Sequence, residues 1–371
     1  MNPGRLWAMA RKEAIQLHRD PRSLVMAFLL PVALLLFFGY AISYDVNNIE
    51  LAILDESNSE RSRALVHAFE SSGYFEIVEY PARYEDVDDL LQRSKALAVL
   101  VIPPSFDRDL AAGRDAAVQL LLDGSDANSA TIAQNYAAAI MIRYSSDVLL
   151  QARRFVLPAQ AETRVWYNET LESRNMIVPG LVAVIMSIIA ALLTALTIAR
   201  EWERGTMEQL AATPVHRLEV VIGKLIPYIG IGLFDVALAI VAGLLIFGVP
   251  LRGNVLLLTG LTLLFLIGAL SFGMFISAAV KSQVLASQIA IQTTYLPAIL
   301  LSGFIFSIST MPIVLQAVTY AVPARYYVTV TKGIFLKGVG PEVLWVQGLA
   351  MIIFATAGLT LAIRSFRKEL E

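Results

Sequence analysis

Cysteine is absent from the 371-residue sequence. Disulfide bonds, thiolate zinc sites and cysteine nucleophiles are therefore all excluded. The three histidines (His18, His67 and His216) are far apart, and none has the spacing of a zinc-binding HExxH motif. The sequence also contains no GxxxxGK[ST] motif, so it has no loop of the type that cradles ATP phosphates.

Charged residues are scarce as well, at 16% of the chain against roughly 25% in a typical soluble domain. Hydrophobic residues make up 57%, which argues against both a soluble enzyme and a disordered protein. The 29 basic and 31 acidic residues leave no basic excess that would indicate nucleic-acid binding. Residues 44–175 hold 33 of these charges and are acidic, so the rest of the chain is far more apolar than the average.

Six apolar windows are long enough to form membrane-spanning helices, because about 20 residues cross a hydrocarbon core of about 30 Å. Pro31 lies in the first window, and Asp235 lies in the third. The windows are 24–43, 176–199, 225–249, 255–280, 284–306 and 345–363. The sequence therefore predicts an α-helical integral membrane protein with six transmembrane helices.

Lysine and arginine in the short loops predict the orientation of these helices. The N-terminal tail, the loop 200–224, Lys281 and the C-terminal tail hold 13 basic residues, against 4 in the short loops of the other side. Both termini are therefore placed in the cytoplasm and residues 44–175 outside. Cleavage of window 24–43 as a signal peptide is the alternative, but its apolar run is too long.

Residues 1–23 are interpreted as an amphipathic elbow helix in the cytoplasmic membrane interface. Trp7, Ala10, Ala14 and Leu17 recur at helical spacing, with charged residues between them. Such a helix places its aromatic residue at headgroup depth. A plain basic anchor that only sets the topology is the alternative.

Residues 44–175 have the alternating pattern of a small extracytoplasmic α/β (α+β) domain. Strands are predicted at 50–54, 75–78, 97–102, 118–122 and, more weakly, 163–167, with helices at 57–72, 86–94 and 105–112. A long helix is predicted over 126–151, capped by Asp126 or Ser129. The acidic cluster at 85–89 lacks EF-hand spacing, so an acidic helix start is favoured over a metal site.

The loop 200–224 is the most informative segment of the apolar part, and it reads REWERGTMEQLAATPV from Arg200 to Val215. Thr206 and Gln209 have capping-box spacing, so a short helix is predicted from Thr206 to just before Pro214. Gly205 permits a sharp turn before that helix. A short charged helix held against the membrane suits docking to a cytoplasmic partner, and a simple re-entry turn is the alternative.

This loop resembles the signature segment of ABC-2-type transporter permeases, through ERGTMEQL at 203–210 and TPV at 213–215. Further motifs follow in the family's order: KLIPY at 224–228, FGVPLRG at 247–253, LSGFIF at 301–306, MP at 311–312, YY at 326–327 and KGIFLKG at 332–338. DGSDAN at 123–128 is similar to the bacterial drug-efflux-type subgroup with a large periplasmic domain. Glu169 follows Asn168 where that subgroup usually has proline, which affects only a local turn.

The resemblance implies a permease subunit of an exporter in the bacterial inner membrane, which moves an amphipathic drug or lipid-like substrate outward. It implies no cofactor on this chain, because ATP and Mg are handled by a separate ATP-binding subunit. Segment 201–213 would be the coupling helix that seats in this subunit. The expected coupling residues are Glu201, Trp202, Glu203, Arg204, Gly205, Thr206, Glu208, Gln209 and Leu210. A second permease chain, identical or different, and a periplasmic adaptor (membrane fusion) protein are the other expected partners.

Polar residues inside the predicted spans are the candidates for the substrate pathway, because an unpaired charge there costs at least about 2.5 kcal/mol. Asp235 is the acid deep in the third window. Gln288, Gln292 and Tyr295 share one face of the fifth, which predicts a lining of the pathway or a seam between two chains. Structural hydrogen bonds between helices are the alternative role for all four.

Residues 307–344 are too interrupted to span a membrane and are interpreted as external re-entrant or interfacial helices. Two other functions stay open from the residues alone. The chain could be a membrane-anchored receptor or scaffold whose external domain binds a ligand, or a secondary transporter that uses no nucleotide. A secondary transporter more often shows repeated halves, and this sequence has no internal repeat.

Overall fold

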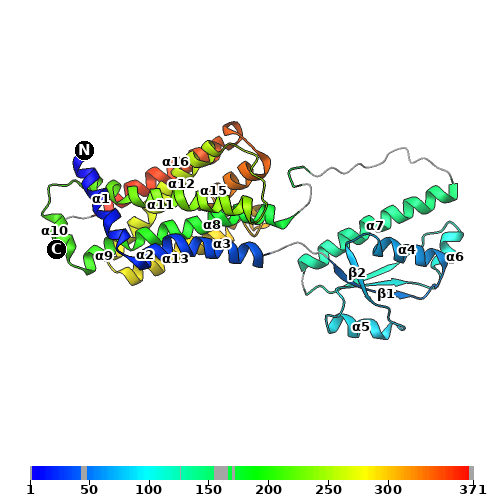
Figure 1. Cartoon of the computed structure of the whole chain (residues 1–371). Helices are drawn as coiled ribbons and strands as arrows, with labels where there is room; N and C mark the ends of the chain where they lie inside the picture. The colour runs from blue at the N-terminus through cyan, green and yellow to red at the C-terminus, as the bar shows by residue number, and fades with distance from the viewer. Residues whose placement is uncertain (1, 43–47, 126, 154–165, 169–171, 367–371) are drawn as a thin grey trace. The chain divides into compact units, whose positions relative to one another are not determined.

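The computed structural model describes residues 2–42, 48–125, 127–153, 166–168 and 172–366. The chain divides into two compact units, which we call the helical unit (Met1–Ser43 with Val165–Glu371) and the inserted unit (Tyr44–Arg164). The inserted unit carries a sheet, and the helical unit is built from helices alone over its described residues (Figure 1). A mostly helical fold with a small mixed α/β insert between early helices agrees with the predicted fold class.

The helical unit begins with α1, which leads through a short turn into a second helical run. This run is continuous from Pro21 to Ala41, and it changes from α to π and back. The remaining helices follow the inserted unit in the sequence. The elements are α1 (Pro3–His18), α2 (Pro21–Leu24), η1 (Val25–Leu29), α3 (Leu30–Ala41), α8 (Ser173–Ala195), α9 (Thr197–Glu203), α10 (Thr206–Ala211), α11 (Arg217–Leu245), α12 (Val255–Val280), α13 (Gln283–Leu300), η2 (Ile308–Thr310), α14 (Ile313–Thr319), α15 (Pro323–Lys332), η3 (Gly333–Lys337) and α16 (Pro341–Ser365).

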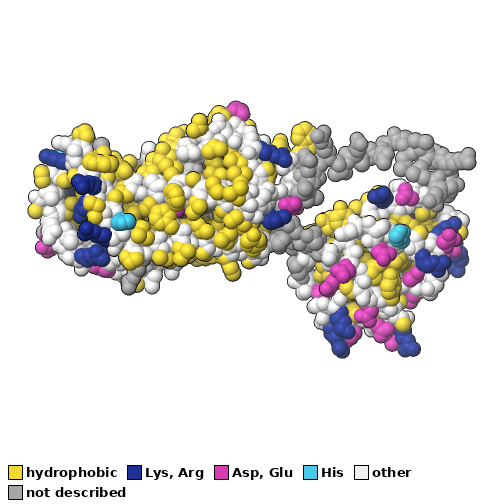
Figure 2. Space-filling view, viewed as in Figure 1, with side chains coloured by type: hydrophobic (Ala, Val, Ile, Leu, Met, Phe, Trp, Pro, Cys, Tyr) yellow, Lys and Arg dark blue, Asp and Glu magenta, His cyan; other side chains and the backbone are white. Residues whose placement is uncertain are grey.

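Four helical segments among the described residues are long and apolar enough to cross a membrane. They are Ser173–Glu203, which joins α8 and α9, and the helices α11, α12 and α16. These four overlap the second, third, fourth and sixth windows predicted from the sequence. The first window contains a shorter apolar helix, Val25–Ala41. A broad apolar surface covers the helical unit, and Figure 2 shows it between the charged ends.

The fifth predicted window, 284–306, is helical only up to Leu300, where α13 ends. The last six residues of this window, 301–306, are therefore not helical. Gly303 takes a left-handed conformation (φ +79°) that breaks the helical path. The Lys332 side chain donates to the carbonyl oxygens of Gly303 and Phe304 at 3.2 and 3.4 Å. These bonds satisfy carbonyl groups that a continued helix would have paired internally.

Pro31 is accommodated by the π-helical turn that precedes it. Proline has no N–H, and its ring collides with the carbonyl group four residues earlier in a regular α-helix. In η1 the hydrogen bond instead runs from the Leu30 N–H to the Val25 carbonyl, five residues back. The wider turn relieves the crowding, so the helix passes Pro31 without ending.

The α8 helix forms the centre of the helical unit, because 83% of its apolar window is buried, against 22–50% for α11, α12 and α16. It packs against α12, α13, α15 and α3. Small residues allow the close approach: Ala191 and Ala195 of α8 meet Ala286 and Ala290 of α13. At Gly273 of α12, an added Cβ would lie 2.3 Å from the Ala191 carbonyl oxygen. Backbones packed this closely require small residues at the crossing points.

The inserted unit is a four-stranded sheet in the order β2-β1-β3-β4. β1 pairs parallel with β2 and β3, and β3 pairs antiparallel with β4. One face packs on α4, α6 and α7, where Phe69 and Phe106 are buried, and the other face packs on α5. The elements are β1 (Ile49–Asp55), α4 (Glu60–Glu70), β2 (Phe75–Glu79), α5 (Glu85–Gln92), β3 (Ala98–Ile102), α6 (Phe106–Ala111), β4 (Gln119–Leu122) and α7 (Ala127–Arg153).

Four predicted strands and all four predicted helices of this unit are confirmed in type and approximate place. The acidic cluster forms the first turns of α5. Ser129 lies inside α7, not at its cap, because the helix begins at Ala127, and Asp126 lies outside the described residues. Of the weak strand predicted at 163–167, the described residues Trp166 and Tyr167 are not in a strand, and the rest lie outside the described residues.

Candidate functional site

The segment that the sequence singled out forms a sharp turn and a short helix at the end of the helical unit that also carries α1 (Figure 1). Gly205 separates α9 from α10 and has a left-handed conformation, with φ +67°. Its role in the predicted turn is confirmed, since residues with a Cβ adopt this conformation at a cost of about 1–2 kcal/mol. The helix α10 (Thr206–Ala211) ends before Pro214, as predicted.

The predicted capping box at the start of α10 was wrong. Gly205 is the cap residue, and no side chain caps the helix. The Thr206 hydroxyl instead donates to the Glu201 carbonyl oxygen at 3.4 Å, which ties α10 back onto α9. Glycine at the cap position leaves no side-chain oxygen for the free N–H groups of the first turn.

A buried cluster of charged residues holds this segment to α1 and α11. The ammonium group of Lys224 lies 2.7 Å from a carboxylate oxygen of Glu13 and 3.1 Å from one of Glu201. Lys224 is completely buried, and Glu13 and Glu201 are 3% and 1% exposed. The Tyr228 hydroxyl donates to the second oxygen of Glu13 at 3.0 Å. Lys12 adds a further ion pair to Glu201 at 2.9 Å.

A second polar cluster lies beside the first and joins α9 to the turn between α1 and α2. The Arg200 guanidinium lies 2.7 Å from the Asp20 carboxylate and donates to the Ser23 hydroxyl at 3.2 Å. The Ser23 hydroxyl in turn donates to Asp20 at 2.7 Å. Arg200 is only 8% exposed, so its charge is compensated by these partners inside the protein.

Glu203 connects the same segment to α13, and Trp202 connects it to the end of α12. The Glu203 carboxylate accepts a hydrogen bond from the backbone N–H of Gln283, the first residue of α13, at 2.7 Å, and another from the Gln283 side chain. A carboxylate at a helix N-terminus satisfies free N–H groups and interacts favourably with the helix dipole. The Lys281 ammonium lies 4.4 Å from the centre of the Trp202 ring, a cation–π contact.

The predicted coupling residues therefore include a buried group and an exposed group, with Trp202 and Thr206 half-buried between them. Glu201 and Leu210 are buried and face the helical unit. The side chains of Arg204, Glu208 and Gln209 are exposed, and so is Glu203, which contacts α13. The exposed group consists of charged and amide side chains that point outward from the turn. The inner side of the turn contacts α1, α11 and α13.

Sequence reasoning did not single out Glu13, Lys224 and Tyr228 as members of this cluster. One signal was available: Glu13 lies three residues after Ala10 and four before Leu17, so it falls on the apolar face of the N-terminal helix. A charge on an apolar face predicts a buried partner, because an isolated buried carboxylate is costly. The sequence alone does not show that Lys224, more than 200 residues away, supplies this partner.

The predicted pathway residues do not form one site within the chain. Asp235 is 2% exposed in α11, and neither carboxylate oxygen has a hydrogen-bond partner among the described residues. Gln288 and Gln292 lie on the exposed side of α13, and Tyr295 is half-buried there. The opposite side of α13 carries Ala286, Ala290 and Ala298, which are buried.

An apolar cavity of about 460 Å³ lies between α12, α13, α14, α15 and α16. Phe265, Phe272 and Phe354 contribute aromatic surface, and none of the described residues that line the cavity is charged. The hydroxyl groups of Thr293 and Thr294 line the cavity but donate to carbonyl groups of their own helix. The cavity therefore offers apolar contact and few free hydrogen-bond donors.

Comparison with known proteins places the chain in a family. Residues 21–364 match the ABC-2 family transporter protein profile. The probable multidrug ABC transporter permease YbhS of Escherichia coli is 37% identical, over 99% of this chain and 98% of that protein. The similarly named YbhR of E. coli is 30% identical over 98% of this chain, and the inner membrane transport permease YhhJ is 26% identical over 88%. The chain belongs to the ABC-2 family of transporter permeases.

Proposed function

We propose that this chain is the membrane-spanning subunit of an ABC exporter that moves amphipathic compounds outward across a bacterial inner membrane. ATP would be hydrolysed by a separate ATP-binding subunit. One observation carries the proposal: the α9–α10 turn presents exposed Glu208 and Gln209 while buried ion pairs hold its inner side to α1 and α11. Such a turn suits the transmission of force from a docked partner to several helices. The names of YbhS and YbhR support multidrug compounds as cargo.

The proposed topology has six spans: the four long apolar segments, the run Val25–Ala41 and α13. Val25–Ala41 and α13 are short, at 17 and 18 residues, which is at the lower end of the range for a spanning helix. The distribution of lysine and arginine supports a cytoplasmic location of both termini and of the loop 200–224. Residues 1–23 are then the elbow helix, 24–43 the first span, 44–175 the periplasmic domain, and 176–371 the other spans with an external re-entrant segment at 307–344.

The proposed coupling path starts where the ATP-binding subunit contacts Glu208 and Gln209. Movement of α10 would pass to α9 through Gly205 and the Thr206 hydrogen bond. From α9, Glu201 connects to α11 through Lys224, and Glu203 connects to α13 through Gln283. Charged groups paired in a buried setting are costly to separate, so α11 would move together with α9 and the turn.

A second permease chain would complete the pathway, and the exposed face of α13 is the proposed seam. Gln288 and Gln292 are exposed on an apolar helix, so in a bilayer they need partners that this chain does not provide among its described residues. Glutamines hydrogen-bond well across neighbouring helices. The seam accepts either an identical chain or a related one, and co-purification of tagged chains would distinguish the two.

The apolar cavity supports an amphipathic cargo. Its volume of about 460 Å³ falls within the range of drug-binding pockets, roughly 300–1,000 Å³. An apolar lining without charges binds hydrocarbon or aromatic portions of a compound and selects weakly among headgroups. These properties fit a transporter that accepts several apolar or amphipathic molecules.

The coupling assignment is tested by the double variant Glu208→Ala/Gln209→Ala. Both side chains are exposed and form no hydrogen bond or ion pair with other described residues, so the fold should be preserved. We expect the affinity for the ATP-binding subunit to fall by about tenfold or more, because interface hot spots contribute at least about 2 kcal/mol. Co-purification, ATPase stimulation by substrate and drug efflux from cells are the measurements.

Glu342→Ala is the matched control, because Glu342 is an exposed acid in the first turn of another helix, α16. It should leave all three measurements unchanged. Glu203→Ala is less decisive, since it also removes the carboxylate that caps α13. Normal co-purification and efflux by the double variant would show that α10 is not the docking helix.

A further inference from the structure

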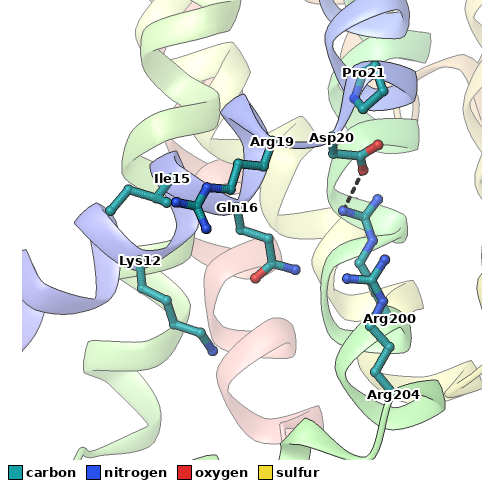
Figure 3. A pocket seen from close by; sticks show the side chains of 8 residues that line it. All are labelled: Lys12, Ile15, Gln16, Arg19, Asp20, Pro21, Arg200 and Arg204. Atoms are coloured by element: carbon teal, nitrogen blue, oxygen red, sulfur yellow. Dashed lines mark ion pairs between the residues drawn. The ribbon is translucent and has the colours of Figure 1, made fainter.

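A basic pocket of about 610 Å³ lies between α1, the start of α2 and the end of α9 (Figure 3). Figure 3 shows Lys12 and Gln16 on α1, Arg19 directly after it and, across the gap, Arg200 and Arg204. The lining consists of Lys12, Ile15, Gln16, Arg19, Asp20, Pro21, Arg200 and Arg204. Four cationic side chains thus surround one space that contains a single carboxylate.

Two of the four cations are compensated by acids, and two are not. Arg200 pairs with Asp20, and Lys12 pairs with Glu201 behind the pocket wall. The exposed side chains of Arg19 and Arg204 have no ion-pair partner in the part of the chain that the structure describes. They leave a net charge of +2 on opposite sides of the pocket, which favours an anion between them.

The rim of the pocket is apolar and lies next to a helix that enters the membrane. Ile15 is 44% exposed, and Pro21 opens the helical run that continues into Val25–Ala41. Trp7, on the same helix as Ile15, is 68% exposed, as expected for a ring at headgroup depth. Figure 2 shows lysine and arginine gathered at this end of the helical unit, directly beside the apolar surface.

We propose that this pocket binds the phosphate of an anionic phospholipid of the cytoplasmic leaflet, with its glycerol and first acyl carbons against Ile15 and Pro21. Guanidinium groups bind phosphate oxygens through paired hydrogen bonds. Basic pockets at the cytoplasmic ends of membrane helices are a known setting for anionic headgroups. The lipid would join α1 to Arg204, the residue directly before Gly205. It would thereby make the α9–α10 turn more rigid.

The full-length chain is placed in nanodiscs that contain equal amounts of phosphatidylglycerol and phosphatidylcholine. The test measures which lipids stay bound to the chain when it is released from them. Native mass spectrometry gives the ratio of the two lipids bound. We expect Arg19→Gln and Arg204→Gln each to lower the preference for phosphatidylglycerol by about fivefold, and the double variant to lower it by the product. Arg252→Gln is the matched control: Arg252 is an exposed arginine in the connection between α11 and α12, and its substitution should change nothing.

Three results would overturn the proposal. Unchanged lipid preference in the double variant is one, and an equal loss in Arg252→Gln is another. The third is displacement of the lipid by inorganic phosphate at millimolar concentration, because it would contradict the apolar contact with Ile15 and Pro21. If the double variant keeps phosphatidylglycerol and also loses the ATP-binding subunit in co-purification, the pocket is assigned to an acidic segment of that partner. None of these measurements depends on transport. The lipid site and the proposed export function are therefore tested independently.

Discussion

Lys224 is the residue on which the anchoring of the α9–α10 turn depends most directly. It is completely buried and lies within 3.1 Å of carboxylate oxygens from two different helices. Two carboxylates around one ammonium group form a network. Its contribution to stability depends on all its members, because each charged group has lost its hydration. Removing the cation alone therefore costs far more than the net contribution of the intact cluster.

Lys224→Met should lower the stability of the permease by about 3–5 kcal/mol, since it leaves Glu13 without a cation in a buried position. The triple variant Glu13→Gln/Glu201→Gln/Lys224→Met should recover most of that loss, because it removes the buried charges together. Thermal unfolding in detergent measures both. Lys337→Met, at an exposed lysine, is the control and should melt like the parent protein. Equal destabilisation in the single and triple variants would mean that packing, not charge, makes Lys224 important.

At the scale of single elements, α13 has two faces with different tasks. Ala286 and Ala290 are fully buried against α8, where the small side chains set the distance between the helices. Gln288 and Gln292 lie on the exposed side. The inner face belongs to the fold of one chain, and the outer face is available for the proposed seam with a second chain.

Ala290→Leu should therefore destabilise the single chain by about 1–3 kcal/mol, because it forces extra carbon atoms into a close helix crossing. Gln292→Leu should leave the melting temperature of the monomer unchanged but weaken pairing, since it removes a hydrogen-bonding group from the seam. Thermal unfolding and cross-linking of tagged chains separate the two effects. A monomer melt that falls equally for both variants would contradict the assignment of the two faces.

Elements that depend on local sequence patterns were predicted, and features that depend on contacts between distant residues were not. Apolar length predicted the four long spans, and alternation predicted the strands, because both signals are local. The length of the fifth window does not give the end of α13 at Leu300, because the following turn depends on Gly303 in a left-handed conformation and on its contact with the distant Lys332. The ion cluster around Lys224 could not be predicted for the same reason: its members come from helices far apart in the chain.

At the scale of the whole molecule, the inserted unit has a hydrophobic core of its own. Phe69 and Phe106 are fully buried with strand residues such as Leu51 and Leu100, and α7 closes the same face. The residues proposed for coupling all belong to the helical unit. We therefore propose separable tasks for the two units: the helical unit would dock the ATP-binding subunit, and the inserted unit would contact a periplasmic adaptor.

Expression of residues 44–164 alone should give a domain that unfolds cooperatively in urea, as followed by circular dichroism. Phe69→Ala should lower its free energy of unfolding by about 3–5 kcal/mol, because it leaves a cavity in the core. Tyr80→Ala, at a side chain that is 62% exposed, should have little effect. In the full chain, replacing residues 44–164 with a flexible linker should preserve co-purification of the ATP-binding subunit while efflux that needs an adaptor is lost. Loss of the ATP-binding subunit from this deletion variant would show instead that the inserted unit is required to form the coupling end of the helical unit.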